Sequence, residues 1–230
     1  NPTFTYTNPG NYTTSLLVTT NHGCTDSVTL NVLVSPHPVL DFGPNAADCA
    51  PVCVTMTNNS TILLGSIISY QWNFGDGSAG AGATPTHCYD NTSHTTLMEY
   101  DVTLTAVSDQ GCVSTETHTQ AITAYPVPLA HFEASPEITD IYQPEIQFTD
   151  LSIIASTWDW DFGDSTFSTQ TNPLHEYTDT GSYLVTLYIE NIYGCKDTTD
   201  KLVLVRPTYG VWIPDAFTPD GDGVNDYFSV

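Results

Sequence analysis

Acidic residues carry most of the chemistry that this sequence offers. Near its end, residues 220–226 read Asp-Gly-Asp-Gly-Val-Asn-Asp, so that oxygen ligands alternate with small residues. Carboxylates of Asp220, Asp222 and Asp226 and the backbone carbonyl of Val224 can turn onto one hard cation, as in a calcium-binding loop. A plain turn built from Asp, Gly and Asn has the same composition. We therefore expect calcium as a cofactor here, with an ordinary turn as the alternative.

A second carboxylate cluster lies in the stretch Trp-Asp-Trp-Asp-Phe-Gly-Asp at residues 158–164. Asp159 and Asp161 would share one face of a strand and could act as an acid/base pair. Aspartates beside turns more often accept hydrogen bonds from backbone N–H groups, and we favour that structural role. We find no nucleophile elbow, zinc-protease motif or phosphate loop, so we predict that the chain is not an enzyme.

The charge balance excludes several classes of partner. Three Lys and Arg residues stand against 26 Asp and Glu, which gives a formal net charge of −23. A surface this acidic does not attract nucleic acid or anionic lipid. No apolar run approaches the roughly 20 residues of a membrane span, so we expect no membrane insertion. The 36 Thr and 13 Tyr favour β structure, and a hydrophobic content of 40% suffices for packed cores.

The elements that position these residues recur along the chain. Gly-Cys pairs end at Cys24, Cys112 and Cys195, which are 88 and 83 residues apart. Upstream of the second and third pairs lie a Trp-x-Phe-Gly-Asp motif and a His-x-Tyr motif. Units of this length with regular turn signals predict an all-β fold of tandem immunoglobulin-like β-sandwiches. The motif residues with a predicted structural role are Trp72, Asp76, Tyr89, Trp160, Asp164 and Tyr177.

The repeats do not all fit within the sequence. Residues 1–36 hold only the last two strands of a unit, 37–126 and 127–207 each hold a whole sandwich, and 208–230 begin another module. The sequence therefore has the character of a window from a longer repetitive protein. Two strands cannot bury a core alone, so we expect residues 12–34 to pair and to pack on something outside this window.

Alternation within the repeat identifies core positions. In the third copy, Tyr183, Val185, Leu187 and Ile189 occupy every second position and should face a core. Trp72 and Trp160 occupy equivalent positions, and we interpret them as core anchors. Trp158 has no such equivalent tryptophan in the second copy. If it is exposed, its alternative role is to stack on a carbohydrate. The paired positions of His87 and His175 favour a structural role over metal binding, and the other five histidines lack ligand spacing.

Six cysteines and almost no lysine suggest an oxidising, extracellular setting. Aligning the second copy on the third places Cys53 opposite Glu145 and Cys88 opposite Glu176. Because the third copy lacks both cysteines and the second has both, we predict a Cys53–Cys88 disulfide. Cys49–Cys112 is our first choice for a further bridge, and the pairing of the remaining cysteines stays open.

The Trp-x-Phe-Gly-Asp motif, the His-x-Tyr motif and the Tyr-x-Val-x-Leu strand that follows resemble the polycystic-kidney-disease (PKD) domain. The resemblance covers residues 37–207 in full and 1–36 by half. It implies an immunoglobulin-like sandwich without catalytic activity of its own, used as a spacer, adhesion or carbohydrate-associated module. The sequence departs from the family pattern at Asn73, where Asp is usual, and at Ser165, where Gly is usual.

Residues 213–228, Ile-Pro-Asp-Ala-Phe-Thr-Pro-Asp-Gly-Asp-Gly-Val-Asn-Asp-Tyr-Phe, resemble the opening of the gliding-motility-associated C-terminal domain. That resemblance implies export by the type IX secretion system of Bacteroidetes and attachment at the outer cell surface. With the repeats, it leads us to expect a non-catalytic segment of a large secreted adhesin or extracellular filament. Expected partners are protein or glycan surfaces and copies of the chain itself. The alternative is a set of spacers in a secreted protease or polysaccharide hydrolase.

Overall fold

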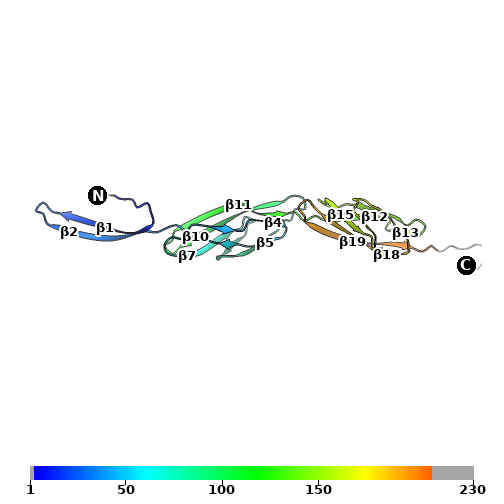
Figure 1. Ribbon diagram of the computed structural model, residues 1–230, viewed down its shortest axis with the longest axis horizontal. Coiled ribbons are helices and arrows are strands. Elements are labelled where there is room, and N and C mark those ends of the chain that lie inside the picture. Colours follow the sequence, from blue (N-terminus) through cyan, green and yellow to red (C-terminus); the bar gives the residue numbers. More distant parts are fainter. Residues whose placement is uncertain (1–2, 209–230) are drawn as a thin grey trace, which may run out of the picture. The chain divides into compact units, whose positions relative to one another are not determined.

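The computed structural model describes residues 3–208, and every regular element within them is a β-strand, which confirms the predicted all-β fold (Figure 1). The expected calcium ligands Asp220, Asp222, Val224 and Asp226 lie outside the described residues. The chain divides into two compact units between Val127 and Pro128, and each is described by itself below.

The first unit opens with a long antiparallel hairpin. It consists of β1 (Gly10–Thr19) and β2 (Thr25–Val34), paired without interruption from Gly10↔Val34 to Thr19↔Thr25 (Figure 1). The rings of Tyr6 and Tyr12 stack at 4.1 Å beside the start of β1. The predicted pairing of residues 12–34 is therefore confirmed.

The rest of the first unit is a two-layer sandwich, here named sandwich A. One layer is a five-stranded sheet in the order β4-β11-β10-β7-β8, in which β4 runs parallel to β11. The opposite layer consists of two short antiparallel pairs, β3-β6 and β5-β9. The strands are β3 (Phe42–Gly43), β4 (Ala46–Cys49), β5 (Val52–Thr55), β6 (Thr57–Asn58), β7 (Ile67–Asn73), β8 (Ala79–Ala81), β9 (Thr86–Tyr89), β10 (Met98–Ser108) and β11 (Val113–Tyr125).

The second unit, named sandwich B, repeats this plan. Its five-stranded sheet has the order β13-β19-β18-β15-β16, again with a parallel first pair, and its other sheet has the order β12-β14-β17. An uninterrupted β14 pairs with both neighbours, where sandwich A has the separate strands β5 and β6. The strands are β12 (Phe132–Ser135), β13 (Ile138–Asp140), β14 (Glu145–Asp150), β15 (Thr157–Asp161), β16 (Phe167–Ser168), β17 (Leu174–Glu176), β18 (Gly181–Glu190) and β19 (Lys196–Arg206).

Alternating side chains of the two layers form each core, because successive residues of a strand point to opposite faces. Val185, Leu187 and Ile189 of β18 are buried as predicted, whereas the ring of Tyr183 is only partly buried at the edge of the core. The outer face of the same strand carries Leu184 and Tyr188, which are exposed. The buried face of β18 is the one with consecutive aliphatic residues, whereas the outer face interrupts its apolar residues with Thr186.

Glycine is required where β7 and β15 end. Gly75 has φ of +85°, and a Cβ at that position would lie 2.4 Å from the carbonyl oxygen of Asp101. Gly163 repeats this geometry against Leu184. Gly77 has a similar φ of +92° but faces open space, and Ser165 occupies the corresponding position of sandwich B with φ of 72°.

Replacing Gly75 by alanine should therefore destabilise sandwich A much more than replacing Gly77. Gly77→Ala meets only the left-handed backbone penalty of about 1–2 kcal/mol, whereas Gly75→Ala adds a backbone clash. Denaturant titration of both variants checks this order. Equal losses in the two variants would show that the close approach to Asp101 does not constrain the turn.

Candidate functional site

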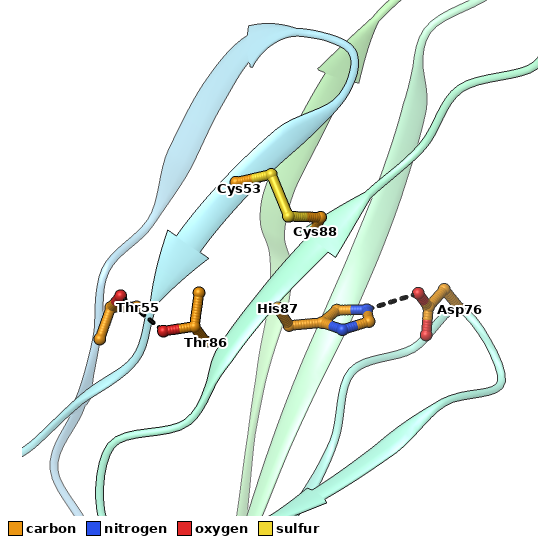
Figure 2. Close-up of a disulfide and its surroundings, with 6 residues drawn as sticks. All are labelled: Cys53, Thr55, Asp76, Thr86, His87 and Cys88. Atoms are coloured by element: carbon orange, nitrogen blue, oxygen red, sulfur yellow. Dashed lines mark hydrogen bonds and ion pairs between the residues drawn. A yellow bond between two sulfur atoms is a disulfide. The ribbon is translucent and has the colours of Figure 1, made fainter.

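Sandwich A holds a cluster of three polar side chains where the β7–β8 turn meets β9. The Nε2 atom of His87 lies 2.7 Å from Oδ2 of Asp76 and 3.1 Å from Oγ of Ser78. Ser78 donates from its hydroxyl and from its backbone N–H to Oδ1 of the same aspartate. Figure 2 shows the His87 ring reaching from its strand to Asp76 on the turn.

Aromatic packing holds the His87 ring in place. The ring stacks on Phe74 with centroids 4.2 Å apart and an interplanar angle of 8°, and it meets Tyr89 edge to face at 4.7 Å. Asn73 shapes the turn, because its side-chain oxygen accepts a hydrogen bond from the N–H of Gly75. Ring packing on β9 and the Asx turn after β7 together orient the three polar groups.

The same arrangement recurs in sandwich B. Nε2 of His175 lies 2.8 Å from Oδ2 of Asp164, and the His175 ring stacks on Phe162 at 4.0 Å. Thr166 takes the place of serine and donates to Asp164 from its hydroxyl and backbone N–H. We name these two clusters the His–Asp clasps. They fasten a turn of one layer to a strand of the other.

The clasps have the residue types of a hydrolytic triad but a different connectivity. In a triad, the carboxylate and the hydroxyl bind opposite nitrogens of the imidazole, so that the ring can pass a proton between them. Here Nε2 faces both groups, and the hydroxyl of Ser78 donates directly to Asp76. The hydroxyl is not activated by this arrangement. The geometry therefore supports the structural role predicted for Asp76, Asp164, His87 and His175.

Hydrogen bonding stabilises the charged carboxylates of the clasps. Burial alone would raise the pKa of Asp76, but hydrogen bonds from Ser78 and His87 outweigh it and hold the pKa at about 2. The pKa of Asp164 is likewise lowered, because bonds from Thr166 and His175 exceed the effect of its burial.

Acid should therefore weaken the clasps. The pKa of Asp76 falls from an ordinary 3.8 to about 2 on folding, so its stabilising effect is complete above pH 4 and disappears between pH 4 and pH 2. At pH 5, Asp76→Asn should reduce the free energy of unfolding of sandwich A by about 1 kcal/mol or less, the value typical of a solvent-accessible pair. Denaturant titration at pH 5 and pH 2 should show this difference closing.

Asp109→Asn, in an exposed turn of the same sandwich, controls for the general loss of charge. If the difference between the parent and Asp76→Asn stays the same at pH 2, the carboxylate of Asp76 is not the group that stabilises the clasp.

The motif tryptophans and tyrosines form the core beneath the clasps. Trp72 and Trp160 are buried and donate from Nε1 to the carbonyls of Gly82 and Gln170, at 2.9 and 2.8 Å. Their predicted role as core anchors is confirmed. Tyr89 is equally enclosed, and burial raises the pKa of its hydroxyl.

Trp158 and Asp159 line a surface hollow of sandwich B, whereas Asp161 belongs to the turn after β15. Trp158 is partly buried and packs against the core, so it is not the fully exposed side chain that the stacking alternative assumed. Oδ1 of Asp161 accepts the N–H of Gly163 at 2.9 Å, as predicted for an aspartate beside a turn. Asp159 lies on the outer face, opposite Tyr188.

The predicted Cys53–Cys88 disulfide is present. It joins directly opposed residues of β5 and β9, beside the hydrogen bond between Thr55 and Thr86 (Figure 2). In sandwich B, the opposed pair at this place is Glu145↔Glu176, as the alignment of the two copies indicated. The bridge thus occurs in only one of two otherwise similar sandwiches.

The predicted Cys49–Cys112 bridge is wrong. Cys112 is a free thiol in the turn before β11, whereas Cys49 is disulfide-bonded and lies opposite Tyr125 at the far end of that strand. β11 has 13 residues, which at about 3.3 Å each separates its ends by about 40 Å. A disulfide needs Cα atoms within about 7 Å, so the bridge is excluded.

Sequence reasoning missed Ser78 and Thr166 in the clasps. Their signal was a hydroxyl residue two positions after the motif aspartate in both copies. A comparison of the two copies by residue identity overlooks this signal, because Ser and Thr are different residue types.

Among residues 3–208, no group of three or more His, Cys, Asp or Glu side chains is arranged to hold a metal ion. Within the same residues, no helix has the length and hydrophobicity to cross a membrane.

Comparisons with known proteins agree with this architecture. The PKD domain family profile matches residues 35–124 and again residues 123–205. A microbial collagenase of Vibrio alginolyticus is 40% identical over 68 residues, which are 30% of this chain and 8% of the collagenase. The chain therefore corresponds to less than a tenth of that relative.

Two solved structures also match. The PKD1 domain of Vibrio anguillarum Epp is 24% identical with a TM-score of 0.32, over 36% of this chain and 96% of that domain. The PKD1 domain of the Vibrio cholerae metalloprotease PrtV is 29% identical with a TM-score of 0.31, over 34% and 96%. The two matches of the PKD domain profile together cover residues 35–205, which is most of the chain. The chain therefore belongs to the PKD domain family.

Proposed function

We propose that the chain is a non-catalytic segment of a large secreted adhesin or extracellular fibre, in which PKD sandwiches act as spacer and adhesion modules. The observation that carries this proposal is the tandem repeat. Two whole sandwiches follow each other with abutting family matches at residues 35–124 and 123–205, and each has its own core. Domains that bury separate cores can be strung together, so reach grows with the number of copies.

Further features support an extracellular location. The Cys53–Cys88 disulfide is a bond that persists outside the reducing cytosol. The net charge of −23 favours solubility of the protein and repels polyanions. Export by type IX secretion and attachment at the cell surface of a Bacteroidetes species belong to the same proposal, as does calcium at Asp220, Asp222, Val224 and Asp226. Protein or glycan surfaces and further copies of the chain are the proposed partners.

A second candidate is a spacer role in a secreted protease. The similarity to a microbial collagenase and to the PKD1 domain of a metalloprotease favours it over a polysaccharide hydrolase. In that case the PKD sandwiches would hold a catalytic domain at a distance from the cell or from its substrate.

Antibodies against the purified chain separate these functions. Immunogold electron microscopy of the producing cells should place the label along surface fibres or a surface coat. Zymography of the immunoprecipitated native protein should show no protease activity. Label confined to a soluble protein that digests gelatin would instead establish the protease spacer.

A further inference from the structure

The hairpin β1–β2 presents an apolar face that no other part of residues 3–208 covers. Leu16 and Val18 of β1 are each 54% exposed, and Val28 and Leu30 of β2 are exposed beside them. Leu16 lies directly opposite Val28 in the hairpin, so these side chains form a continuous patch. An apolar patch of this kind on a β-sheet is typical of an interaction site.

The third repeat shows what this face becomes in a complete domain. The pairing from Gly10↔Val34 to Thr19↔Thr25 is reproduced from Gly181↔Val205 to Glu190↔Lys196, at a constant offset of 171 residues. Leu16 therefore corresponds to Leu187, and Val18 to Ile189. Those two residues are only 0% and 2% exposed in sandwich B.

Aromatic residues of the amino-terminal half of sandwich B cover that position. Phe132, Phe148 and Trp160 share one core cluster with Leu187 and Ile189. All three come from strands that precede residue 172, the position equivalent to Asn1. The hairpin thus corresponds to the carboxy-terminal strands β18 and β19 of a sandwich. The strands that cover them in sandwich B lie within residues 127–171, which supply strands to both sheets.

Two polar residues, Asp26 in β2 and Tyr6 just before β1, also correspond to residues that contact the amino-terminal half of sandwich B. Asp26 corresponds to Asp197, whose Oδ2 accepts the N–H of Ala130 at 2.8 Å. Tyr6 corresponds to Tyr177, whose hydroxyl donates to the carbonyl of Phe162 at 3.0 Å. In the hairpin, the Tyr6 hydroxyl instead bonds to Thr14, 2.6 Å away.

We propose that the inner face of β1–β2 is an acceptor surface for the amino-terminal half of a PKD sandwich. The segment that it accepts carries a Trp-x-Phe-Gly-Asp motif and the strand pattern of residues 127–171. Its tryptophan covers Leu16 and Val18, and its motif phenylalanine offers a carbonyl to Tyr6. The stretch just before its first strand offers an N–H to Asp26, as Ala130 does to Asp197. A second copy of this chain does not fit as the donor, because its equivalent segments already cover β10–β11 and β18–β19.

A graft tests this proposal on the full chain. A copy of residues 127–171 is joined directly ahead of Asn1, which restores the spacing of sandwich B. Hydrogen exchange of the β1 and β2 amides should slow by about 100-fold or more relative to the parent chain, because the strands become part of a cooperative unit. Sandwiches A and B serve as internal references, since their exchange should not change.

Adjacent leucines provide the matched variants. In the grafted chain, Leu16→Asp should abolish the added protection, whereas Leu17→Asp should keep it. Leu17 corresponds to Tyr188, which is 51% exposed on the outer face of sandwich B. Exchange that stays at the parent level after grafting overturns the proposal. So does a parent chain whose hairpin is already protected in a dimer, because a second copy would then be the occupant.

Discussion

Trp160→Ala should reduce the free energy of unfolding of sandwich B by about 3–5 kcal/mol, the loss typical of a buried tryptophan. Trp160 is fully buried, its ring meets Phe132 and Phe148 at 5.0 and 5.7 Å, and its Nε1 donates to the carbonyl of Gln170. Alanine would leave a cavity between the two sheets and a carbonyl without its donor. A loss of this size is a large fraction of the stability of an ordinary domain.

Thermal and denaturant unfolding of the full chain provide the measurement. Sandwich A should keep its transition, because its core forms separately around Trp72. Leu202→Ala is the matched control, since Leu202 lies exposed on the outer face of β19 and its truncation opens no cavity. If Trp160→Ala costs no more than Leu202→Ala, Trp160 is not the anchor of this core.

The second large effect concerns the disulfide of sandwich A. A Cys53→Ser/Cys88→Ser double variant should lose about 3–4 kcal/mol in the chain-entropy model, because the bridge closes a loop with a sequence separation of 35. The reciprocal variant, Glu145→Cys/Glu176→Cys, places cysteines at the corresponding opposed pair of sandwich B and removes two facing carboxylates. This variant should form a disulfide and raise the denaturant concentration at which half of sandwich B is unfolded.

Reduction with dithiothreitol distinguishes the effect of the bridge from that of the mutations. Under reducing conditions, the parent and the Cys53→Ser/Cys88→Ser variant should unfold at nearly the same denaturant concentration. A gap that persists after complete reduction would mean that the serines themselves, and not the loss of the bridge, destabilise sandwich A.

Internal repetition made much of this molecule predictable. Alternation along β18 identified Val185, Leu187 and Ile189 as core residues, because one face of a sheet must be buried. Comparing two copies of one repeat identified Cys53 and Cys88 as partners, since a pair that is present or absent together reveals contact. The repeat also indicated that His87 and His175 have equivalent structural roles.

Long-range geometry could not be predicted in the same way. The Cys49–Cys112 error arose because a parallel pairing of β4 with β11 places Cys49 at the end of β11 remote from Cys112. Such a pairing leaves no local signal in the sequence, unlike a hairpin with its turn residues. The clasp hydroxyls of Ser78 and Thr166 were missed because the repeats were compared by residue identity. Hydrogen bonding depends on the hydroxyl group, which Ser and Thr share.

Single-molecule force spectroscopy tests the central claim, that the sandwiches are independent spacer modules, most directly. The other four cysteines are replaced by serine, so that Cys53–Cys88 is the only disulfide that can form. The chain should then unfold in two discrete steps, one for each sandwich. Reduction should lengthen one step by about 12 nm, the extended length of the 35 residues that the bridge withholds, and leave the other unchanged. Extension without discrete steps, or a single step that includes both sandwiches, would contradict the account.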